Sequence, residues 1–286
     1  MTIPASVLAS ETHHLTSAAG REYRITVALP LAYATAPDDG WPLDAAPSSW
    51  PTVYVLDGNW YFGLVTDMIR PMSWCGGTSD AIVVGIGYEE GDDPREAFRA
   101  ALTRRNLDLT PTRDPAGEQS LARRFDQPVP TGGAKTFSDF IVSELTPFIE
   151  KRYRADASRR MLIGHSYGGL FAAYSLFKAP GHFASYVIGS PTLAYGDRSV
   201  FQQEERFAGD NDALPARVFF YAGDEEFVDD TTLTDTIRFV TILRSRNYES
   251  LELATRYFPD YDHCAVAAPG IHAGLNFALA KRRIDD

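Results

Sequence analysis

Short apolar segments rich in β-branched and aromatic residues alternate with helix-length segments along most of this 286-residue chain, and this alternation constrains the fold more than any other feature. The apolar segments lie at residues 52–56, 81–86, 160–164, 184–189, 217–222 and 251–257. Buried strands separated by helices are typical of βαβ units and a parallel sheet. A segment at 23–29 alternates apolar and polar residues, which predicts an early antiparallel strand. We therefore predict an α/β fold with a mostly parallel central sheet and helices on both faces.

Helical segments are expected between the predicted strands. One should begin at about residue 61, and others should occupy about 168–178, 233–247 and 268–283. After Ala134, apolar residues recur at helical spacing, which predicts one more helix directly before the strand at 160–164.

Two segments lack such patterns. Residues 34–50 are rich in proline, aspartate, alanine and serine, which predicts a surface loop. Residues 89–133 show little apolar periodicity, and their arginines are balanced by acidic residues. Long irregular segments inside a compact domain are usually functional or mobile. We therefore predict that residues 89–133 form an insertion that covers or shapes a functional site.

Composition limits the possible partners and organisation. The chain is 44% hydrophobic, which is enough for one domain spanning residues 1–286. Its formal net charge of −11 disfavours steering towards nucleic acid or anionic lipid, so neither is predicted as a partner. No apolar run reaches the length of a membrane span, and residues 1–6 lack the features of a secretory leader. A cytoplasmic protein is expected, and the sequence is silent on oligomeric state.

The two cysteines, Cys75 and Cys264, give little evidence of a special role. They show no CxxC spacing and no cluster of partner ligands, so no metal site is predicted. Buried free thiols are favoured, although the sequence leaves a disulfide open.

The most specific motif is Gly164-His165-Ser166-Tyr167-Gly168, which lies between an apolar strand and a helix. A strand, a G-x-S-x-G turn and a helix in this order form the nucleophile elbow of α/β-hydrolases. The sharp turn strains the serine backbone and exposes its hydroxyl, and the glycines avoid collisions with neighbouring backbone. The N-terminal N–H groups of the helix face developing negative charge. We predict that Ser166 is a nucleophile.

A serine hydroxyl needs a base, and in α/β-hydrolases the acid and then the histidine follow the serine. His182 comes directly after the elbow helix, too early for an acid to precede it, and is expected in an exposed loop. His272 falls in or beside the last helix and is expected at the surface. His263 lies in the loop between the last strand and the last helix, which is where the catalytic base belongs.

The acid should follow the strand at 217–222, where residues 223–230 form an acidic segment. Composition alone does not choose among these carboxylates, since most of them fit a solvated loop. One of them should accept a hydrogen bond from Nδ1 of His263 and hold its tautomer.

An oxyanion hole needs two backbone N–H donors. We expect one from Tyr167, directly after the nucleophile, and the other from Asn59, after the strand at 52–56. An ordinary turn with Asn59 as a helix cap fits the sequence equally well. Trp60 and the two aromatic residues after it either line the substrate pocket or belong to the core of the first helix.

Together these motifs resemble an esterase family of α/β-hydrolases that includes the siderophore trilactone esterases, esterase D and the feruloyl esterase domains. The resemblance extends over almost the whole chain, and its most specific segment is 163–170. The other segments that carry it are 20–25, 54–59, 103–111, 132–134 and 140–154. It implies an α/β-hydrolase fold and a serine carboxylic-ester hydrolase that forms an acyl-enzyme on Ser166 without a metal or cofactor.

The resemblance also implies further site residues. The family places its acid three residues after a glycine, which here points to Glu226, with Asp224 as the alternative. In the siderophore branch, arginines meet an anionic catecholate–iron complex, and Arg104 and Arg105 lie in the corresponding segment. Solvated surface positions explain these arginines equally well. With Trp60, they are the predicted substrate-binding residues.

The predicted function is hydrolysis of small to medium carboxylic esters, with siderophore-like macrolactones as candidate substrates. An acyltransferase that uses the same catalytic residues is one alternative, and a non-catalytic binding protein on this scaffold is another. The presence of Ser166, His263 and Glu226 together argues against the binding protein.

Overall fold

The predicted apolar segments build one central sheet. The computed structural model describes residues 6–33, 47–89, 93–226 and 231–281, and within these ranges eight strands pair in the order β1-β2-β4-β3-β5-β6-β7-β8. The strands are β1 (Ser10–Thr16), β2 (Glu22–Ala28), β3 (Trp50–Val55), β4 (Ile82–Gly87), β5 (Ala155–His165), β6 (Ser185–Gly189), β7 (Ala213–Glu225) and β8 (Glu249–Asp262). β1 and β2 pair antiparallel, β2 pairs antiparallel with β4, and the remaining pairs are parallel. The predicted mostly parallel sheet with an early antiparallel strand is confirmed.

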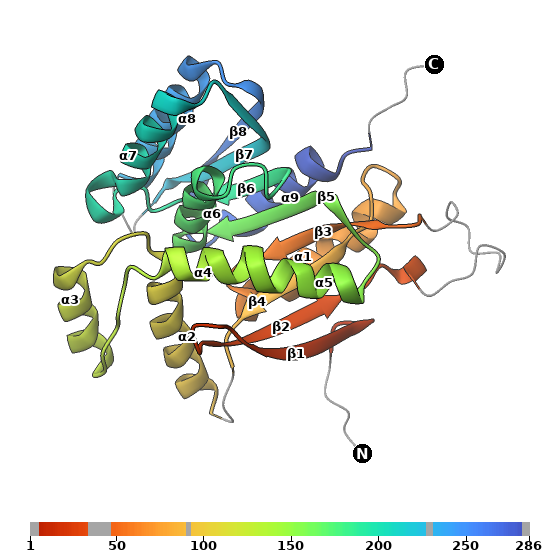
Figure 1. Cartoon of the computed structure of the whole chain (residues 1–286), viewed down its shortest axis with the longest axis horizontal. Coiled ribbons are helices and arrows are strands. Elements are labelled where there is room, and N and C mark those ends of the chain that lie inside the picture. The colour runs from red at the N-terminus through yellow and green to blue at the C-terminus, as the bar shows by residue number, and fades with distance from the viewer. Residues whose placement is uncertain (1–5, 34–46, 90–92, 227–230, 282–286) are drawn as a thin grey trace.

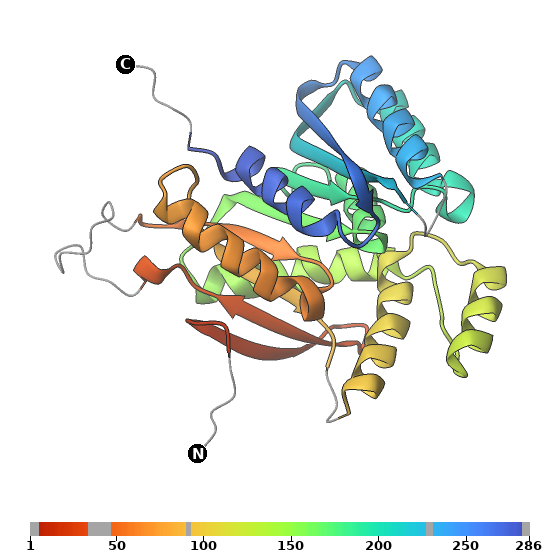
Figure 2. The same ribbon diagram turned by 180° about the vertical axis from the view of Figure 1, so that it is seen from behind.

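Helices lie on both faces of this sheet, as predicted. They are α1 (Gly58–Trp74), α2 (Pro94–Leu109), α3 (Pro115–Phe125), α4 (Ala134–Phe140), α5 (Thr146–Arg152), α6 (Tyr167–Lys178), α7 (Tyr195–Asp210), α8 (Thr232–Arg246) and α9 (Ala267–Leu279), with a 3₁₀ turn η1 (Leu31–Tyr33). α4, α5, α6 and α8 pack on one face (Figure 1). α1 and α9 pack on the other (Figure 2).

This two-sided cover explains why the central strands are apolar throughout. Every residue of β3, β4 and β6 is buried, as expected for strands with helices on both faces. Side chains of neighbouring β3 residues enter opposite cores, because Tyr54 belongs to the core under α4 and α6 whereas Val53 and Val55 belong to the core under α1 and α9.

The expectation of an irregular segment at 89–133 is wrong in part, because this segment contains α2 and α3. Both helices lie beyond the carboxyl ends of the parallel strands (Figure 1). The buried face of α2 includes polar residues such as Arg105 and Asp108, so α2 has no continuous apolar stripe, and α3 buries no residue. The sequence does mark where these helices begin, because Asp93 and Asp114 each cap a helix and precede a proline, which is typical of a helix N-terminus.

Two other elements also lack the apolar pattern. β1 is an edge strand with mostly exposed or half-buried side chains, so it has no apolar alternation to detect. In α7, the three residues after Tyr195 are in the left-handed conformation and interrupt regular helical spacing; they are Gly196, Asp197 and Arg198. The loop predicted at 34–50 falls mainly outside the described residues.

The helix predicted after Ala134 forms but is not uniform. α4 continues into a π-type turn, η2 (Ile141–Leu145), and then into α5. Pro147, near the start of α5, has no N–H to donate to the preceding turn. Proline and π-type turns both interrupt the regular hydrogen-bond ladder of a helix.

Both cysteines are free, but they are exposed rather than buried, so the predicted burial is wrong. Cys75 ends α1 and Cys264 precedes α9, and connections between elements lie at the surface. In the described ranges, no helix has the length and apolar character needed to cross a membrane. The same ranges contain no group of three histidine, cysteine, aspartate or glutamate side chains arranged to hold a metal ion.

Candidate active site

The candidate residues come together at the carboxyl edge of the sheet. Asn59 follows β3, Ser166 follows β5, Glu226 follows β7 and His263 follows β8. Because these strands are parallel, their carboxyl ends share one edge, which is where open α/β sheets bind ligands. Residues from four distant parts of the chain thereby meet on one side of the molecule.

Ser166 occupies a strained turn between β5 and α6. Its φ of 61° and ψ of −121° lie in a region that non-glycine residues rarely adopt. The Ser166 N–H donates to the carbonyl oxygen of Gly189 at 2.9 Å, and its carbonyl oxygen accepts from the N–H of Leu170 at 2.9 Å. The turn is too tight for a side chain at Gly164, where a Cβ would lie 2.1 Å from the carbonyl oxygen of Gly168.

His263 and Glu226 form a buried contact. Nδ1 of His263 lies 2.5 Å from Oε2 of Glu226, and the two side chains are 6% and 3% exposed. The other carboxylate oxygen, Oε1, accepts from the hydroxyl of Ser190 at 2.6 Å and from the N–H of Gly223 at 3.2 Å. A carboxylate held in this way requires a proton on Nδ1, so Nε2 of a neutral His263 is the proton acceptor.

Asp224, the alternative acid, is directed elsewhere. Its Oδ1 accepts from the N–H of Asp260 at 2.8 Å, and the side chain is exposed. Of the two carboxylates to which the family resemblance points, only Glu226 contacts His263. Residues 227–230 of the predicted acidic segment lie outside the described residues.

His165 connects the base to the nucleophile turn. Its ring lies 4.9 Å from the ring of His263, and its Nε2 lies 2.8 Å from the carbonyl oxygen of His263. In the described part of the chain, no hydrogen bond joins the hydroxyl of Ser166 to the ring of His263. Such bonds are often long in unliganded active sites and tighten when substrate binds.

The other downstream histidines lie apart from this group. His272 is exposed on α9, as predicted. His182 is half-buried, with its ring edge-on to Phe183 at 4.9 Å and its Nε2 3.4 Å from Oγ1 of Thr146, so its predicted exposure is wrong. Burial, together with the positive charge of Arg160, lowers the pKa of His182 to about 4.

The loop that carries Asn59 is fixed to its neighbours. Asp57 takes the N-cap position of α1, so Asn59 is not the helix cap. The Asn59 side chain donates to the carbonyl oxygen of Tyr88 at 2.9 Å and accepts from the Tyr88 N–H at 2.7 Å. A Cβ on Gly168 would lie 3.1 Å from Oδ2 of Asp57, so this loop touches the first turn of α6, which begins with Tyr167.

Arg105 is buried beside both predicted oxyanion segments. Its Nε and Nη2 donate to the two carboxylate oxygens of Asp57 at 2.7 and 2.9 Å. The guanidinium also lies 5.4 Å from the ring centres of Trp60 and Tyr167. Burial alone would lower the pKa of Arg105, but the carboxylate of Asp57 outweighs it and the pKa is raised. With its side chain 10% exposed, Arg105 lies largely inside the protein, and its predicted contact with substrate stays a prediction.

The other predicted substrate-binding residues differ in position. Trp60 is 37% exposed next to Asn59, whereas Phe62 is buried in the core, so the core alternative holds for Phe62 and the role of Trp60 stays a prediction. Phe98 of α2, which the sequence did not single out, is 52% exposed with its ring 5.7 Å from that of Trp60. Arg104 is exposed and lines a separate hollow beside β2.

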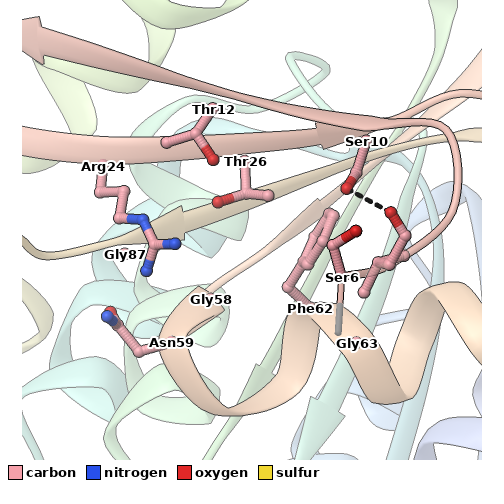
Figure 3. A pocket seen from close by; sticks show the side chains of 11 residues that line it. Ser6, Ser10, Thr12, Arg24, Thr26, Gly58, Asn59, Phe62, Gly63 and Gly87 are labelled. Atoms are coloured by element: carbon pink, nitrogen blue, oxygen red, sulfur yellow. Dashed lines mark hydrogen bonds between the residues drawn. The ribbon is translucent and has the colours of Figure 1, made fainter. Parts of the chain in front are cut away.

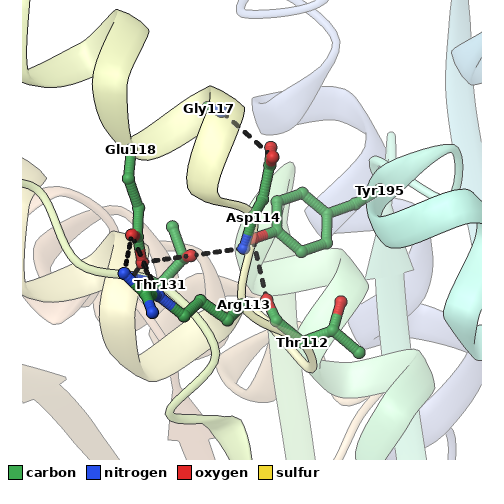
Figure 4. Close-up of polar contacts among 7 residues, drawn as sticks. All are labelled: Thr112, Arg113, Asp114, Gly117, Glu118, Thr131 and Tyr195. Atoms are coloured by element: carbon green, nitrogen blue, oxygen red, sulfur yellow. Dashed lines mark hydrogen bonds and ion pairs between the residues drawn. The ribbon is translucent and has the colours of Figure 1, made fainter.

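A polar network holds the base of α3 (Figure 4). Glu118 accepts from the N–H and the hydroxyl of Thr131, both at 3.0 Å, and pairs with Arg113. The same Thr131 hydroxyl accepts from the N–H of Asp114 at 2.8 Å. Tyr195 of α7 donates to the carbonyl oxygen of Thr112 at 2.9 Å and packs edge-on against Tyr167. The insertion is thus joined through α7 to the turn after Ser166.

A hollow of about 290 Å³ adjoins the Asn59 loop (Figure 3). Arg24 and Thr26 of β2 and Thr12 of β1 line it together with Gly58 and Asn59 at the start of α1. Ser166, Glu226 and His263 do not line it, so this hollow is separate from the group at the carboxyl edge.

Known proteins resemble this chain over most of its length. The family model described as "Putative esterase" matches residues 16–272. The chain is 31% identical over 243 residues to the ferri-bacillibactin esterase BesA of Bacillus subtilis, which covers 82% of this chain and 80% of that protein. It is 30% identical over 206 residues to the siderophore triacetylfusarinine C esterase of Aspergillus fumigatus, covering 71% of this chain and 63% of that protein.

Solved structures resemble the whole fold. The BES protein from Bacillus cereus aligns with a TM-score of 0.79 at 27% identity, and the alignment covers 98% of each chain. The siderophore hydrolase EstB from Aspergillus nidulans aligns with a TM-score of 0.78 at 25% identity over 99% of each chain. The chain therefore belongs to this esterase family of α/β-hydrolases and is a carboxylic-ester hydrolase.

Proposed function

We propose that this esterase acts through Ser166, His263 and Glu226, and that its natural substrates are ester-linked siderophores of the macrolactone type. The catalytic assignment rests on the buried contact between His263 and Glu226 at the edge that carries the strained Ser166 turn. The substrate assignment is supported by relatives named as ferri-bacillibactin and triacetylfusarinine C esterases.

The proposed acylation step begins when Nε2 of His263 accepts the Ser166 proton as Oγ attacks the ester carbonyl carbon. Glu226 stabilises the imidazolium and holds the ring in the required tautomer. The N–H groups of Tyr167 and Asn59 stabilise the negative oxygen of the tetrahedral intermediate. When the intermediate collapses, the bond to the alcohol breaks, and the alcohol leaves with the proton from His263.

The proposed deacylation step repeats this chemistry with water. His263 accepts a proton from the water molecule that attacks the acyl-enzyme. The second tetrahedral intermediate breaks the bond to Oγ, and His263 returns the proton to Ser166. The products are a carboxylic acid and the free enzyme, so this scheme needs neither a metal nor a cofactor.

We propose that Trp60 and Phe98 bind aromatic groups of the substrate. Both rings are exposed, their centres are 5.7 Å apart, and Trp60 follows Asn59 directly. Aromatic rings of a catecholate siderophore would stack or pack edge-on against such a pair. Arg105, whose guanidinium lies 5.4 Å from the ring centre of Trp60, is the arginine proposed for an anionic group at this pair, and Arg104 is proposed for one that reaches the hollow beside β2.

A hydrolysis panel read by mass spectrometry tests this proposal. It compares ferric and iron-free trilactone siderophores with short acyl, aryl and feruloyl esters. We expect the trilactones to give the highest kcat/KM and Ser166→Ala to abolish all turnover. Preference for simple acyl esters would overturn the substrate assignment, and an active Ser166→Ala variant would overturn the nucleophile. Ester products formed with added alcohols would instead identify an acyltransferase.

We further propose a cytoplasmic location, one domain over residues 1–286, and a covering role for α2 and α3. These proposals rest on the sequence patterns and on the position of the two helices beyond the carboxyl edge of the sheet.

A further inference from the structure

His165 is a buried histidine that the proposed mechanism does not use. It is the variable residue before the serine in the G-x-S-x-G motif and is 3% exposed. Its Nε2 lies 2.8 Å from the carbonyl oxygen of His263, and its Nδ1 lies 3.1 Å from the hydroxyl of Tyr221. Both ring nitrogens therefore have partners inside the protein.

These partners define the protonation of His165. A carbonyl oxygen only accepts hydrogen bonds, so Nε2 of His165 carries the proton and donates to His263. Nδ1 is then the acceptor for the hydroxyl of Tyr221. Burial, followed by the nearby His263, lowers the pKa of His165 to about 3. His165 is consequently a neutral ring that holds its neighbours and has no free nitrogen for proton transfer.

The hydrogen bonds of His165 complete a closed circuit of hydrogen bonds around the base. His263 contacts Glu226 through Nδ1, and Glu226 accepts from the hydroxyl of Ser190. The N–H of Ser190 donates to the carbonyl oxygen of Tyr221, whose hydroxyl bonds to His165. His165 returns to the backbone of His263. This circuit of hydrogen bonds thus fixes both the side chain and the main chain of His263 relative to the strand that carries Ser166.

Aromatic contacts of the His165 imidazole also hold this part of the site in place. The imidazole stacks on Tyr221 with an angle of 15° and a centroid distance of 5.8 Å, and Tyr61 of α1 contacts it edge-on. These contacts restrict rotation of a ring that is covalently next to the nucleophile. Displacement of a catalytic group by about 1 Å is enough to cost roughly a hundredfold in rate.

We propose that His165 is a positioning residue, which holds the main chain of His263 so that the base stays aligned with Ser166. This inference rests on the proposed roles of Ser166 and His263. It assigns to the buried imidazole a function in catalysis that is distinct from proton transfer.

Two amide substitutions separate this role from simple core filling. In His165→Gln the side-chain amide reaches the position of Nε2 and donates to the carbonyl oxygen of His263. In His165→Asn the shorter amide reaches only the region of Nδ1, so the bond to His263 is lost. His165→Met fills the space without either bond, and His182→Gln is the matched control at a histidine outside the site.

The measurement is kcat and KM for p-nitrophenyl acetate, with active sites counted by a fluorophosphonate probe. We expect His165→Met and His165→Asn to lower kcat per active site by roughly 10- to 100-fold with KM changed less than about threefold. His165→Gln should recover most of the loss, and His182→Gln should match the native enzyme. A merely structural residue would reduce the number of active sites while leaving kcat per site unchanged.

Two results would overturn the inference: native kcat per site in His165→Met, or a Gln variant no better than the Asn variant. If the Met variant does not fold, the comparison of His165→Gln with His165→Asn still decides. Ser166→Ala separates this inference from the proposed function. Turnover by Ser166→Ala would refute the proposed catalytic residues, whereas an inactive Ser166→Ala beside a fully active His165→Met refutes only the positioning role.

Discussion

At the scale of single residues, the pair of Arg105 and Asp57 concentrates buried charge next to the predicted oxyanion hole. The two side chains are 10% and 2% exposed and share two hydrogen bonds. A buried ion pair contributes little to stability compared with apolar packing, but loss of one partner leaves an uncompensated charge.

We therefore predict that Arg105→Met lowers the free energy of unfolding by about 3–5 kcal/mol. Adding Asp57→Asn should restore part of the loss, because the charge left behind is removed. Denaturant unfolding measures both effects, with Arg104→Met, at an exposed neighbouring position, as the control. Equal stabilities of Arg105→Met and Arg104→Met would show that the pair does not stabilise this loop.

The two acidic residues near the base offer a second comparison. Glu226 contacts Nδ1 of His263, whereas Asp224 accepts from the N–H of Asp260. We predict that Glu226→Gln lowers kcat by roughly a hundredfold to ten-thousandfold, because an amide no longer selects the required tautomer. Asp224→Asn should change kcat by less than about threefold, as expected for a residue that contacts no reacting group. The opposite order in steady-state assays would assign the acid to Asp224.

At the scale of elements, the contacts that hold α3 determine where this part of the insertion lies relative to the proposed active site. α3 buries no residue, so its position depends on the polar network at its base (Figure 4). Thr131 connects two parts of this network, because its hydroxyl donates to the carboxylate of Glu118 and accepts from the N–H of Asp114. Helices held by few apolar contacts open more readily than the core.

We predict that Thr131→Val increases backbone hydrogen exchange across α3 while leaving the sheet unchanged. KM for bulky esters should change more than KM for p-nitrophenyl acetate, because the insertion lies beyond the carboxyl edge that carries the proposed catalytic residues. Gln119→Ala, at an exposed position of α3, is the control. Unchanged exchange in Thr131→Val would mean that other contacts hold the helix.

The elements also show where sequence patterns are sufficient. The apolar strands and the helices that cover them were predictable because burial on both faces imposes a composition. α2, α3 and β1 were not, because their buried contacts are polar or few. The roles of His165 and Arg105 depend on partners 98 and 48 residues away in sequence, and no local pattern identifies such partners.

At the scale of the whole molecule, a small set of buried groups couples folding to pH. Burial is the main cause that lowers the pKa of His165 to about 3 and the pKa of His182 to about 4. Burial also raises the pKa of Asp108 to about 6. Stability rises with pH wherever the unfolded chain binds more protons than the folded protein.

Between pH 6.5 and 5, the unfolded chain protonates both histidines while the folded protein keeps them neutral, which favours unfolding as pH falls. Asp108 opposes this below pH 6, because the folded protein holds a proton that the unfolded chain has released. We predict a net loss of stability on acidification, with each proton contributing at most about 1.4 kcal/mol per pH unit. Denaturant unfolding from pH 7.5 to 5 should show a shallower slope in His182→Asn and a steeper one in Asp108→Asn. Identical slopes in both variants and the native protein would exclude these groups as the origin of the pH dependence.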